Sequence, residues 1–166
     1  MAIFPGRHTG RLDGDFVVFL IGMRFNRPWK ARRSLRVFMA MRPMVKELEA
    51  NPQSGFLHAE YGFLFGGPAL VQYWRSFEDL ERFARDPDAL HLPAWRRFNE
   101  LVSGSGDVGI WHETFRVHAG DYEVIYNNMP RVGLAAAGGH EPLGTASTAS
   151  RRIGARPEDR APVAGY

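Results

Sequence analysis

The sequence predicts an α+β protein with the ferredoxin-like element order β-α-β-β-α-β, which we expect to pair into a dimeric α/β barrel. Strand-like and helix-like segments alternate in that order between residues 16 and 117. Two of these segments carry apolar residues at helical spacing, and the first strand is apolar on both faces. Because two helices cover only one face of such a sheet, the other face needs a second cover, for which we expect a second copy of the chain.

The first strand and the first helix occupy residues 16–51. The segment Phe16–Met23 is rich in β-branched and aromatic residues, which is typical of a strand packed on both sides. The spacing of apolar residues predicts a helix from Trp29 to Asn51, which Pro43 kinks or divides in two. The Pro-Gln-Ser-Gly run that follows Asn51 ends this helix.

A hairpin and a second helix follow. The strands Phe56–Phe65 and Ala69–Arg75 flank a Gly-Gly-Pro turn, and this arrangement predicts a hairpin. Ser76 has the residue type of a helix N-cap, with Asp79 at the capping-box position. We expect a further helical piece to begin near Pro93.

The domain boundaries follow from shifts in composition. The fourth strand, Val108–Val117, completes the predicted sheet. Residues 1–14 contain several glycines and a proline and are expected to form a loose N-terminal arm. Residues 15–134 form the predicted ferredoxin-like domain, whose last part packs on the barrel or on the second copy. Residues 135–166 are rich in Ala, Gly, Ser and Pro, which predicts a flexible tail.

The overall composition is that of one globular domain. The chain has 166 residues, 45% of them hydrophobic, and a formal net charge of +3. It contains no cysteine, which excludes disulfides, thiolate metal sites and cysteine nucleophiles and fits a reducing, cytoplasmic setting. The longest apolar run, Phe16–Met23, is far shorter than the roughly 20 residues of a membrane-spanning helix, so we expect no membrane segment.

Basic residues gather in one stretch, from Arg24 to Arg42. We interpret this stretch mainly as a solvated helix face. Binding of an anionic ligand is the alternative, but no aromatic-rich RNA motif accompanies the cluster and we do not expect nucleic acid as a partner. If the stretch were an interaction surface for an anionic polymer, binding would weaken steeply with salt.

Strand alternation predicts a pocket on the sheet face opposite the helices. In the second strand, His58 and Glu60 share one face, while the other face is uniformly apolar and is expected to meet the helices. If the apolar faces of all strands meet the helices, the pocket has apolar walls and a few polar groups, which is typical of a small-molecule site. The pocket set is His58, Glu60, Gln72, Trp74, His112 and Thr114. The alternative is that His58 and Glu60 lie exposed on an uncovered strand face.

His91 is a second candidate for function. It lies at the junction between helical pieces, flanked by leucines and followed by Trp95 and Phe98. A neutral imidazole in apolar surroundings suits an axial haem ligand, and Arg96 can pair with a propionate. The alternative is an exposed histidine without a ligand role. No dinucleotide, phosphate-loop or zinc-protease motif is present in the sequence.

Three motifs together resemble a known family. They are Phe19-Leu-Ile-Gly-Met-Arg-Phe-Asn26 with Trp29-Lys30, then Gln72-Tyr-Trp-Arg-Ser-Phe-Glu-Asp-Leu80, and Gly109-Ile-Trp-His-Glu-Thr-Phe115 with Tyr126-Asn-Asn-Met-Pro130. Over residues 15–137 the chain resembles the monooxygenase-like proteins grouped as domain of unknown function 4188. Some members of that group are named as related to phenylacetaldoxime dehydratase.

The resemblance implies a dimeric α/β barrel and two kinds of chemistry. Cofactor-independent relatives oxidise electron-rich aromatic molecules, whereas haem-containing relatives include haem-degrading enzymes and aldoxime dehydratases. In several haem-containing relatives the axial histidine lies on or near a helix of the second half, and His91 is the position that matches here.

We therefore expect a small-molecule enzyme that oxygenates an aromatic substrate or uses haem for oxidation or aldoxime dehydration. In the cofactor-free version a histidine removes a substrate proton, while Gln72, Trp74 and Tyr126 position the substrate. In the haem version His91 binds the iron, and His112 or His58 acts as acid or base. The alternative function is a protein that binds haem or a small aromatic molecule without converting it.

Overall fold

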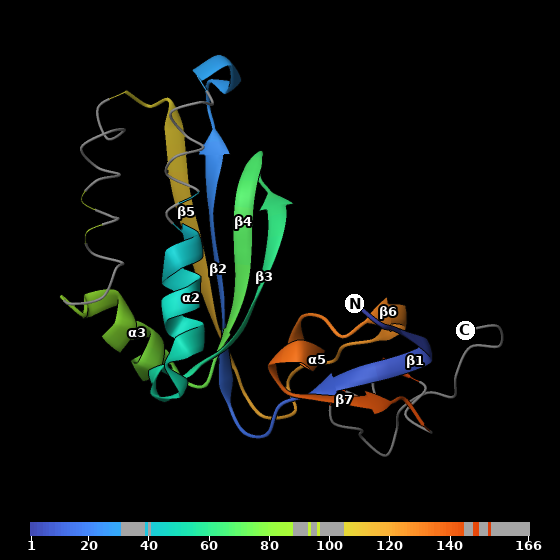
Figure 1. Cartoon of the computed structure of the whole chain (residues 1–166). Helices are drawn as coiled ribbons and strands as arrows, with labels where there is room; N and C mark the ends of the chain where they lie inside the picture. The colour runs from blue at the N-terminus through green and yellow to red at the C-terminus, as the bar shows by residue number, and fades with distance from the viewer. Residues whose placement is uncertain are drawn as a thin grey trace. The chain divides into compact units, whose positions relative to one another are not determined.

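A computed structural model describes residues 1–30, 39, 41–87, 93, 96, 105–144, 148–149 and 153 of the chain. The chain divides into two units (Figure 1). The larger unit comprises residues 17–115, and the smaller unit comprises residues 1–16 and 116–166. The sequence had instead predicted one domain over residues 15–134.

A four-stranded sheet forms the larger unit. Its strands are β2 (Phe16–Phe25), β3 (Phe56–Leu64), β4 (Gly67–Trp74) and β5 (Val108–Val117), in the spatial order β3-β4-β2-β5. The central strand β4 pairs antiparallel with both β2 and β3. This order places the first and third strands of a β-α-β-β-α-β unit at the centre and confirms the predicted ferredoxin-like fold.

Helices cover one face of this sheet. They are α2 (Met41–Ala50) and α3 (Phe77–Arg85), which lie on the same side of the strands in Figure 1. A buried cluster joins both helices to the two central strands, and its members are Val17, Leu48, Trp74 and Leu80. None of the helices in the described part of the chain has the length and apolar character needed to cross a membrane.

The predicted helix from Trp29 to Asn51 is only partly within the described residues. Pro28–Lys30 forms a 3-10 turn, η1, the α-helix α2 covers Met41–Ala50, and Met39 is helical too. Pro43 lies within α2, and Met39, four residues before it, is helical as well. Residues 31–38 and 40 lie outside the described residues, and so does most of the helical piece expected after Pro93.

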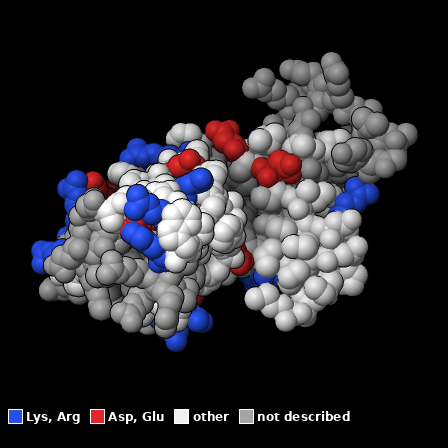
Figure 2. Space-filling model, turned by 90° about the horizontal axis from the view of Figure 1, so that it is seen from above, with Lys and Arg blue, Asp and Glu red and all other residues white. Residues whose placement is uncertain are grey.

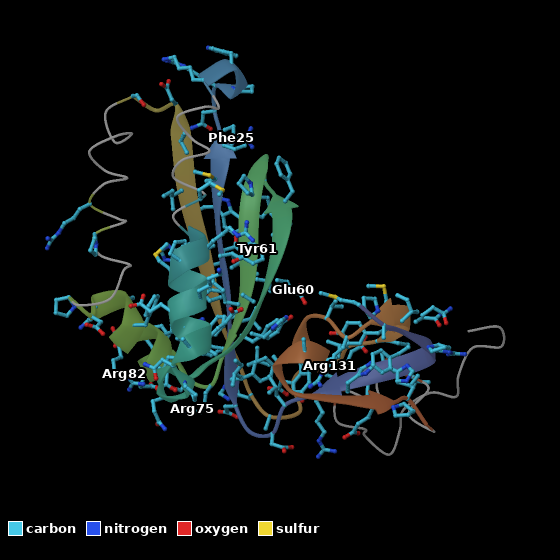
Figure 3. The ribbon with its side chains drawn as sticks, in the orientation of Figure 1. Phe25, Glu60, Tyr61, Arg75, Arg82 and Arg131 are labelled. Carbon is cyan, nitrogen blue, oxygen red and sulfur yellow. The ribbon has the colours of Figure 1, made fainter. Side chains whose placement is uncertain are left out.

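The start of α3 confirms the predicted cap at Ser76. The Asp79 backbone N–H donates to Ser76 Oγ at 3.1 Å. The Asp79 carboxylate accepts a hydrogen bond from Arg75 Nε at 2.9 Å and another from Arg82. Both arginines lie at the same end of the larger unit in Figure 3. Burial alone would raise the pKa of Asp79, but the hydrogen bonds from Arg75, Arg82 and Ser76 outweigh it and lower that pKa.

A three-stranded sheet forms the smaller unit. Its strands are β1 (Ile3–Arg11), β6 (Tyr126–Pro130) and β7 (Gly139–Pro142), with β1 at the centre in the order β6-β1-β7. A short helix, α5 (Leu134–Ala137), contacts β1 and β7. The expected loose N-terminal arm is wrong for residues 3–11, because they form β1. The expected flexible tail from residue 135 is wrong for residues 139–142, because they form β7.

Close packing explains the N-terminal glycines that suggested a loose arm. Gly6 adopts a φ of 81° and donates its N–H to Asn128 Oδ1 at 2.8 Å. At Gly10, a Cβ atom would lie 2.8 Å from the backbone nitrogen of Ala135, so only glycine lets α5 approach β1 this closely. These glycines serve conformation and close approach rather than flexibility.

An aromatic cluster lies on the smaller sheet. The rings of His8 and His140 stack with centroids 4.7 Å apart, and Phe4 meets His140 edge-on at 4.6 Å. The Nε2 atom of His140 is buried and has no hydrogen-bond partner among the described residues. Burial of the ring, together with the positive charges of His8 and Arg131, lowers the pKa of His140 below its usual value.

The lowered pKa of His140 leads us to expect that the folded chain is less stable in mild acid. The pKa of His140 is lower in the folded chain than in the unfolded chain, where it is about 6.5. The neutral ring therefore contributes its full stabilisation of the folded state above about pH 6.5, and this stabilisation is lost as the pH falls through the folded-state pKa. We expect the melting temperature of the wild type to fall further between pH 8 and pH 5 than that of His140→Gln. Thermal unfolding at both pH values measures this, and equal losses would contradict the prediction.

Candidate functional site

A cavity lies between the four-stranded sheet and the helices α2 and α3. It measures about 60 Å³, and Gln72 is the one polar side chain among the described residues that line it. A single water needs about 10–15 Å³, so the cavity has room for several atoms of a ligand. The lining residues are Phe19, Ile21, Met44, Val45, Leu48, Leu70, Gln72, Leu80, Phe83 and Ala84.

Gln72 and Trp74 form a buried hydrogen-bonded pair on the central strand β4. Gln72 is 7% exposed and Trp74 is fully buried. The Trp74 indole Nε1–H donates to Gln72 Oε1 at 2.9 Å. Because an indole N–H can only donate, the atom that it meets must be the amide oxygen. The Gln72 NH₂ group therefore remains as the hydrogen-bond donor on the cavity side of the sheet.

The structure divides the predicted pocket set between the two faces of the sheet. Directly paired residues of an antiparallel sheet share a face, and Gln72 pairs with Ala59 on β3 and with Phe19 on β2. Ala59 and Phe19 pack toward the helices, so Gln72 and Trp74 face the helices as well. Their predicted placement on the opposite face was wrong because Leu70 and Trp74 bury more apolar surface than the alternate residues of β4.

His112 lies on the helix side of the sheet, next to the cavity. Its ring centroid is 5.7 Å from that of Phe19, which lines the cavity. Thr114 is two residues further along β5 and shares this face by strand alternation. Both side chains are exposed. The placement of His112 and Thr114 with His58 was therefore wrong, although their grouping with Gln72 stands.

His58 and Glu60 occupy the opposite face. His58 Nε2 and Glu60 Oε1 are 2.9 Å apart, and the two side chains are 30% and 35% exposed. Their pairing partners on β4 are Tyr73 and Val71, which alternate with Gln72. The predicted neighbourhood of these two side chains is confirmed, but the sheet separates them from the cavity.

The remaining candidates lie elsewhere in the chain. Tyr126 begins β6 in the smaller unit, and its hydroxyl accepts a hydrogen bond from the Ala135 N–H at 3.5 Å. Arg96 is exposed. His91 and Trp95 lie outside the described residues. Within the described ranges, no three His, Asp or Glu side chains stand close enough to hold a metal ion.

The basic stretch contributes two half-exposed cations, Arg27 and Lys30, that pair with one buried carboxylate. Asp107, at the start of β5, is 9% exposed and accepts hydrogen bonds from Arg27 Nη1 and Lys30 Nζ, both at 2.9 Å. The hydrogen bond from Lys30 is the largest of the effects that lower the pKa of Asp107. On the surface drawn in Figure 2, the coloured basic side chains are dispersed and interspersed with acidic ones.

The sequence did not predict that Gln72 and the cavity lie on the face of the sheet that meets the helices. The signal was present in β4, where a glutamine stands between Leu70 and Trp74 in a strand that is otherwise apolar on that face. A polar residue at such a position needs a hydrogen-bond partner, and the indole two residues away supplies it.

Comparison with known proteins assigns the chain to a family. The family model described as monooxygenase af470-like matches residues 16–134. The chain belongs to the monooxygenase af470-like family. The resemblance to monooxygenase-like proteins that was seen in the sequence is therefore confirmed.

This af470-like chain is similar to one curated relative in particular. It is 31% identical over 133 residues to monooxygenase af470 of Aspergillus fumigatus, a match that covers 74% of this chain and 46% of the relative. The chain thus spans about half the length of that relative.

Two solved structures match the chain, and that of aldoxime dehydratase shows a likeness of fold. A crystal structure of aldoxime dehydratase matches with a TM-score of 0.50 and 20% identity, over 81% of this chain and 38% of that one. A dimeric protein of unknown function with a ferredoxin-like fold, from Bacteroides fragilis, matches with a TM-score of 0.44 and 15% identity, over 62% of this chain and 95% of that one.

Proposed function

We propose that this chain is a monooxygenase that oxidises a small, electron-rich apolar molecule in the cavity between the sheet and the helices α2 and α3. The observation that supports the proposal is an apolar cavity with one polar side chain, Gln72, among its described lining, in a member of the af470-like family. An apolar pocket with a few polar groups is typical of small-molecule sites.

The residues around the cavity suggest a cofactor-free reaction with dioxygen. In a phenol substrate, His112 would take up the hydroxyl proton, and the Gln72 NH₂ group would donate to the oxygen that becomes negative. The anion adds dioxygen at a ring carbon, and the hydroperoxide then loses water, so that phenol and O₂ give quinone and H₂O. Thr114 and Trp74 are assigned to positioning, and His58 and Glu60 take no part in this step.

A haem-dependent version fits the described residues less well. An engineered cavity of about 150 Å³ holds benzene, so the cavity of about 60 Å³ that the described residues line takes in only one end of an aromatic molecule and does not enclose a porphyrin. His91 as iron ligand, with Trp95 and Arg96 beside the haem, therefore remains a separate proposal that depends on residues largely outside the described ranges.

Binding without turnover is the second candidate function. It is favoured by the chemistry of the described lining, because neither an amide nor an aliphatic or aromatic hydrocarbon side chain takes up a proton. The same cavity would then hold a small aromatic molecule and release it unchanged.

We also propose that the chain works as a cytoplasmic homodimer that joins the sheet faces opposite the helices. On this face Trp111 packs over Gly22, where a Cβ atom would lie 2.7 Å from the indole ring, and meets Phe65 at 4.7 Å between ring centroids. Phe65 and Phe115 are each about half exposed, at 57% and 49%. A molar mass of one chain in light scattering would refute the dimer.

Oxygen uptake is the experiment that tests the proposed reaction. Purified protein is mixed with 1-naphthol, and dioxygen consumption and quinone formation are followed together for the wild type, His112→Ala and Gln72→Met. We expect one O₂ consumed per quinone formed, and a turnover lowered about 100-fold or more in His112→Ala. Naphthol binding without oxygen uptake would support the binding protein instead.

An absorption spectrum separates the haem version from the cofactor-free one. One equivalent of haem is added to the wild type and to His91→Ala. A sharp Soret band that disappears in the variant would establish a haem site at His91 and overturn the cofactor-free proposal. The absence of a specific band in the wild type would agree with it.

A further inference from the structure

We propose that Gln72 and Trp74 select a neutral ligand that presents a hydrogen-bond acceptor, such as a carbonyl or phenol oxygen, at the end that enters the cavity. The inference rests on the proposed function, because it names the class of molecule that the same cavity takes.

The first observation is the fixed direction of the Gln72 amide. A free glutamine amide can turn either its oxygen or its NH₂ group toward a ligand. Here Trp74 Nε1–H holds the oxygen at 2.9 Å, and no described residue accepts a hydrogen bond from the NH₂ group. The cavity therefore offers a donor to the ligand, and a ligand with an acceptor matches it while a ligand with only a donor does not.

The second observation is the rigidity of this donor. β4 is paired on both sides, with β2 and with β3. Trp74 is fully buried and its ring is flanked by Phe56 and Phe83, at centroid distances of 5.4 and 5.7 Å. Turning the amide would require breaking the indole hydrogen bond inside this packed core. The donor is thus positioned before any ligand arrives, which lowers the entropic cost of binding.

The third observation is the absence of charge in the described lining. Apart from Gln72, the described lining side chains are hydrocarbons or a thioether. An ionised carboxylate or ammonium group buried there would lose its hydration without gaining an opposite charge. A neutral acceptor loses less hydration and gains one hydrogen bond, so the cavity discriminates against charged analogues of the same shape.

A purely structural role accounts for the amide oxygen of Gln72 but not for its NH₂ group. The carbonyl oxygen is used by Trp74, and the NH₂ group donates to no described residue. It is not among the buried polar atoms that lack a partner, so water can reach it when the cavity is empty. A ligand acceptor replaces that water, whereas an apolar ligand end leaves the NH₂ group without a hydrogen bond, which costs free energy. This difference between ligands makes Gln72 a specificity-determining residue.

Three probes of nearly the same shape test the inference. They are acetophenone, which has a carbonyl oxygen, α-methylstyrene, in which CH₂ replaces that oxygen, and benzoate, which carries a charge. Their dissociation constants are measured by isothermal titration with the full-length chain. For the wild type we expect acetophenone to bind about tenfold tighter than α-methylstyrene and benzoate to bind weakest, since one neutral hydrogen bond is worth about a factor of ten.

Two variants and one control isolate the residues. Gln72→Met keeps the length of the side chain and removes the donor, so the preference for acetophenone should fall to about onefold. Trp74→Phe keeps a large ring and releases the amide oxygen, so the preference should shrink while α-methylstyrene binding changes little. Trp29→Phe makes the same exchange as Trp74→Phe at an exposed position outside the cavity lining, so it should keep the wild-type preference.

The outcomes separate this inference from the proposed function. Equal binding of acetophenone and α-methylstyrene by the wild type would overturn the polarity rule and leave the cavity as the proposed ligand site. A preference that persists in Gln72→Met would remove Gln72 from the role. Failure of the wild type to bind any of the three probes would overturn the cavity as the ligand site and the inference with it.

Discussion

Replacing Trp74 by alanine is expected to lower the free energy of unfolding by about 3–5 kcal/mol. The side chain is fully buried, and its ring packs in the cluster that joins both helices to the sheet. The variant removes most of the ring's apolar contacts and leaves a void. It also removes the hydrogen-bond donor to Gln72 Oε1, which adds about 1–3 kcal/mol if no water reaches that oxygen. Urea unfolding followed by circular dichroism measures the loss.

Trp29→Ala is the matched control for this prediction. Trp29 lies in η1 and is 78% exposed, so its removal is expected to change the free energy of unfolding by no more than about 0.5 kcal/mol. A loss in Trp74→Ala that is as small as that in the control would mean that the cluster around Trp74 does not hold the helices on the sheet.

Gly55→Ala should be the second most damaging change, with an expected loss of about 2–4 kcal/mol in the free energy of unfolding. Gly55 has a φ of 79°, in the left-handed region that disfavours other residues. A Cβ atom there would also overlap the carboxylate of Asp79. Relieving the overlap requires moving Asp79 away from Arg75 and Arg82, which both donate to it.

Gly106→Ala separates backbone strain from the overlap. Gly106 has a φ of 62°, but a Cβ atom there would meet nothing within 4 Å. We therefore expect only the cost of the left-handed backbone, about 1–2 kcal/mol. Urea unfolding of both variants gives the comparison. If Gly55→Ala lowers the free energy of unfolding by no more than Gly106→Ala does, the packing of Asp79 against Gly55 contributes nothing to stability.

The strands of the larger unit were predictable because their signals are local. The predicted bounds of the fourth strand, Val108–Val117, are those of β5. The hairpin of β3 and β4 follows from two apolar runs around a glycine pair. The cap at Ser76 depends on an atom only three residues away. Such features need no knowledge of distant parts of the chain.

The faces of the sheet and the whole smaller unit depended on contacts that a single sequence does not display. β1 forms only because β6 and β7, more than 100 residues later, pair with its two edges. The orientation of β4 became clear only from the tertiary contacts of Leu70 and Trp74 with the helices and from the hydrogen bond between Trp74 and the Gln72 amide oxygen. Sequence reasoning therefore found Gln72, Trp74 and His112 as candidates but grouped them with His58 and Glu60 on the wrong side.

The central position of β1 in the smaller sheet has a practical consequence for work with fragments. A recombinant piece cut to the family match, residues 16–134, would lack both β1 and β7. It would keep β6 without the strand to which it is hydrogen-bonded, and the unpaired backbone of such a strand is a template for aggregation. Expression of residues 1–144 retains all the strands that the structure describes in both sheets, so poor behaviour of the shorter piece would report a missing partner strand and not an unstable four-stranded sheet.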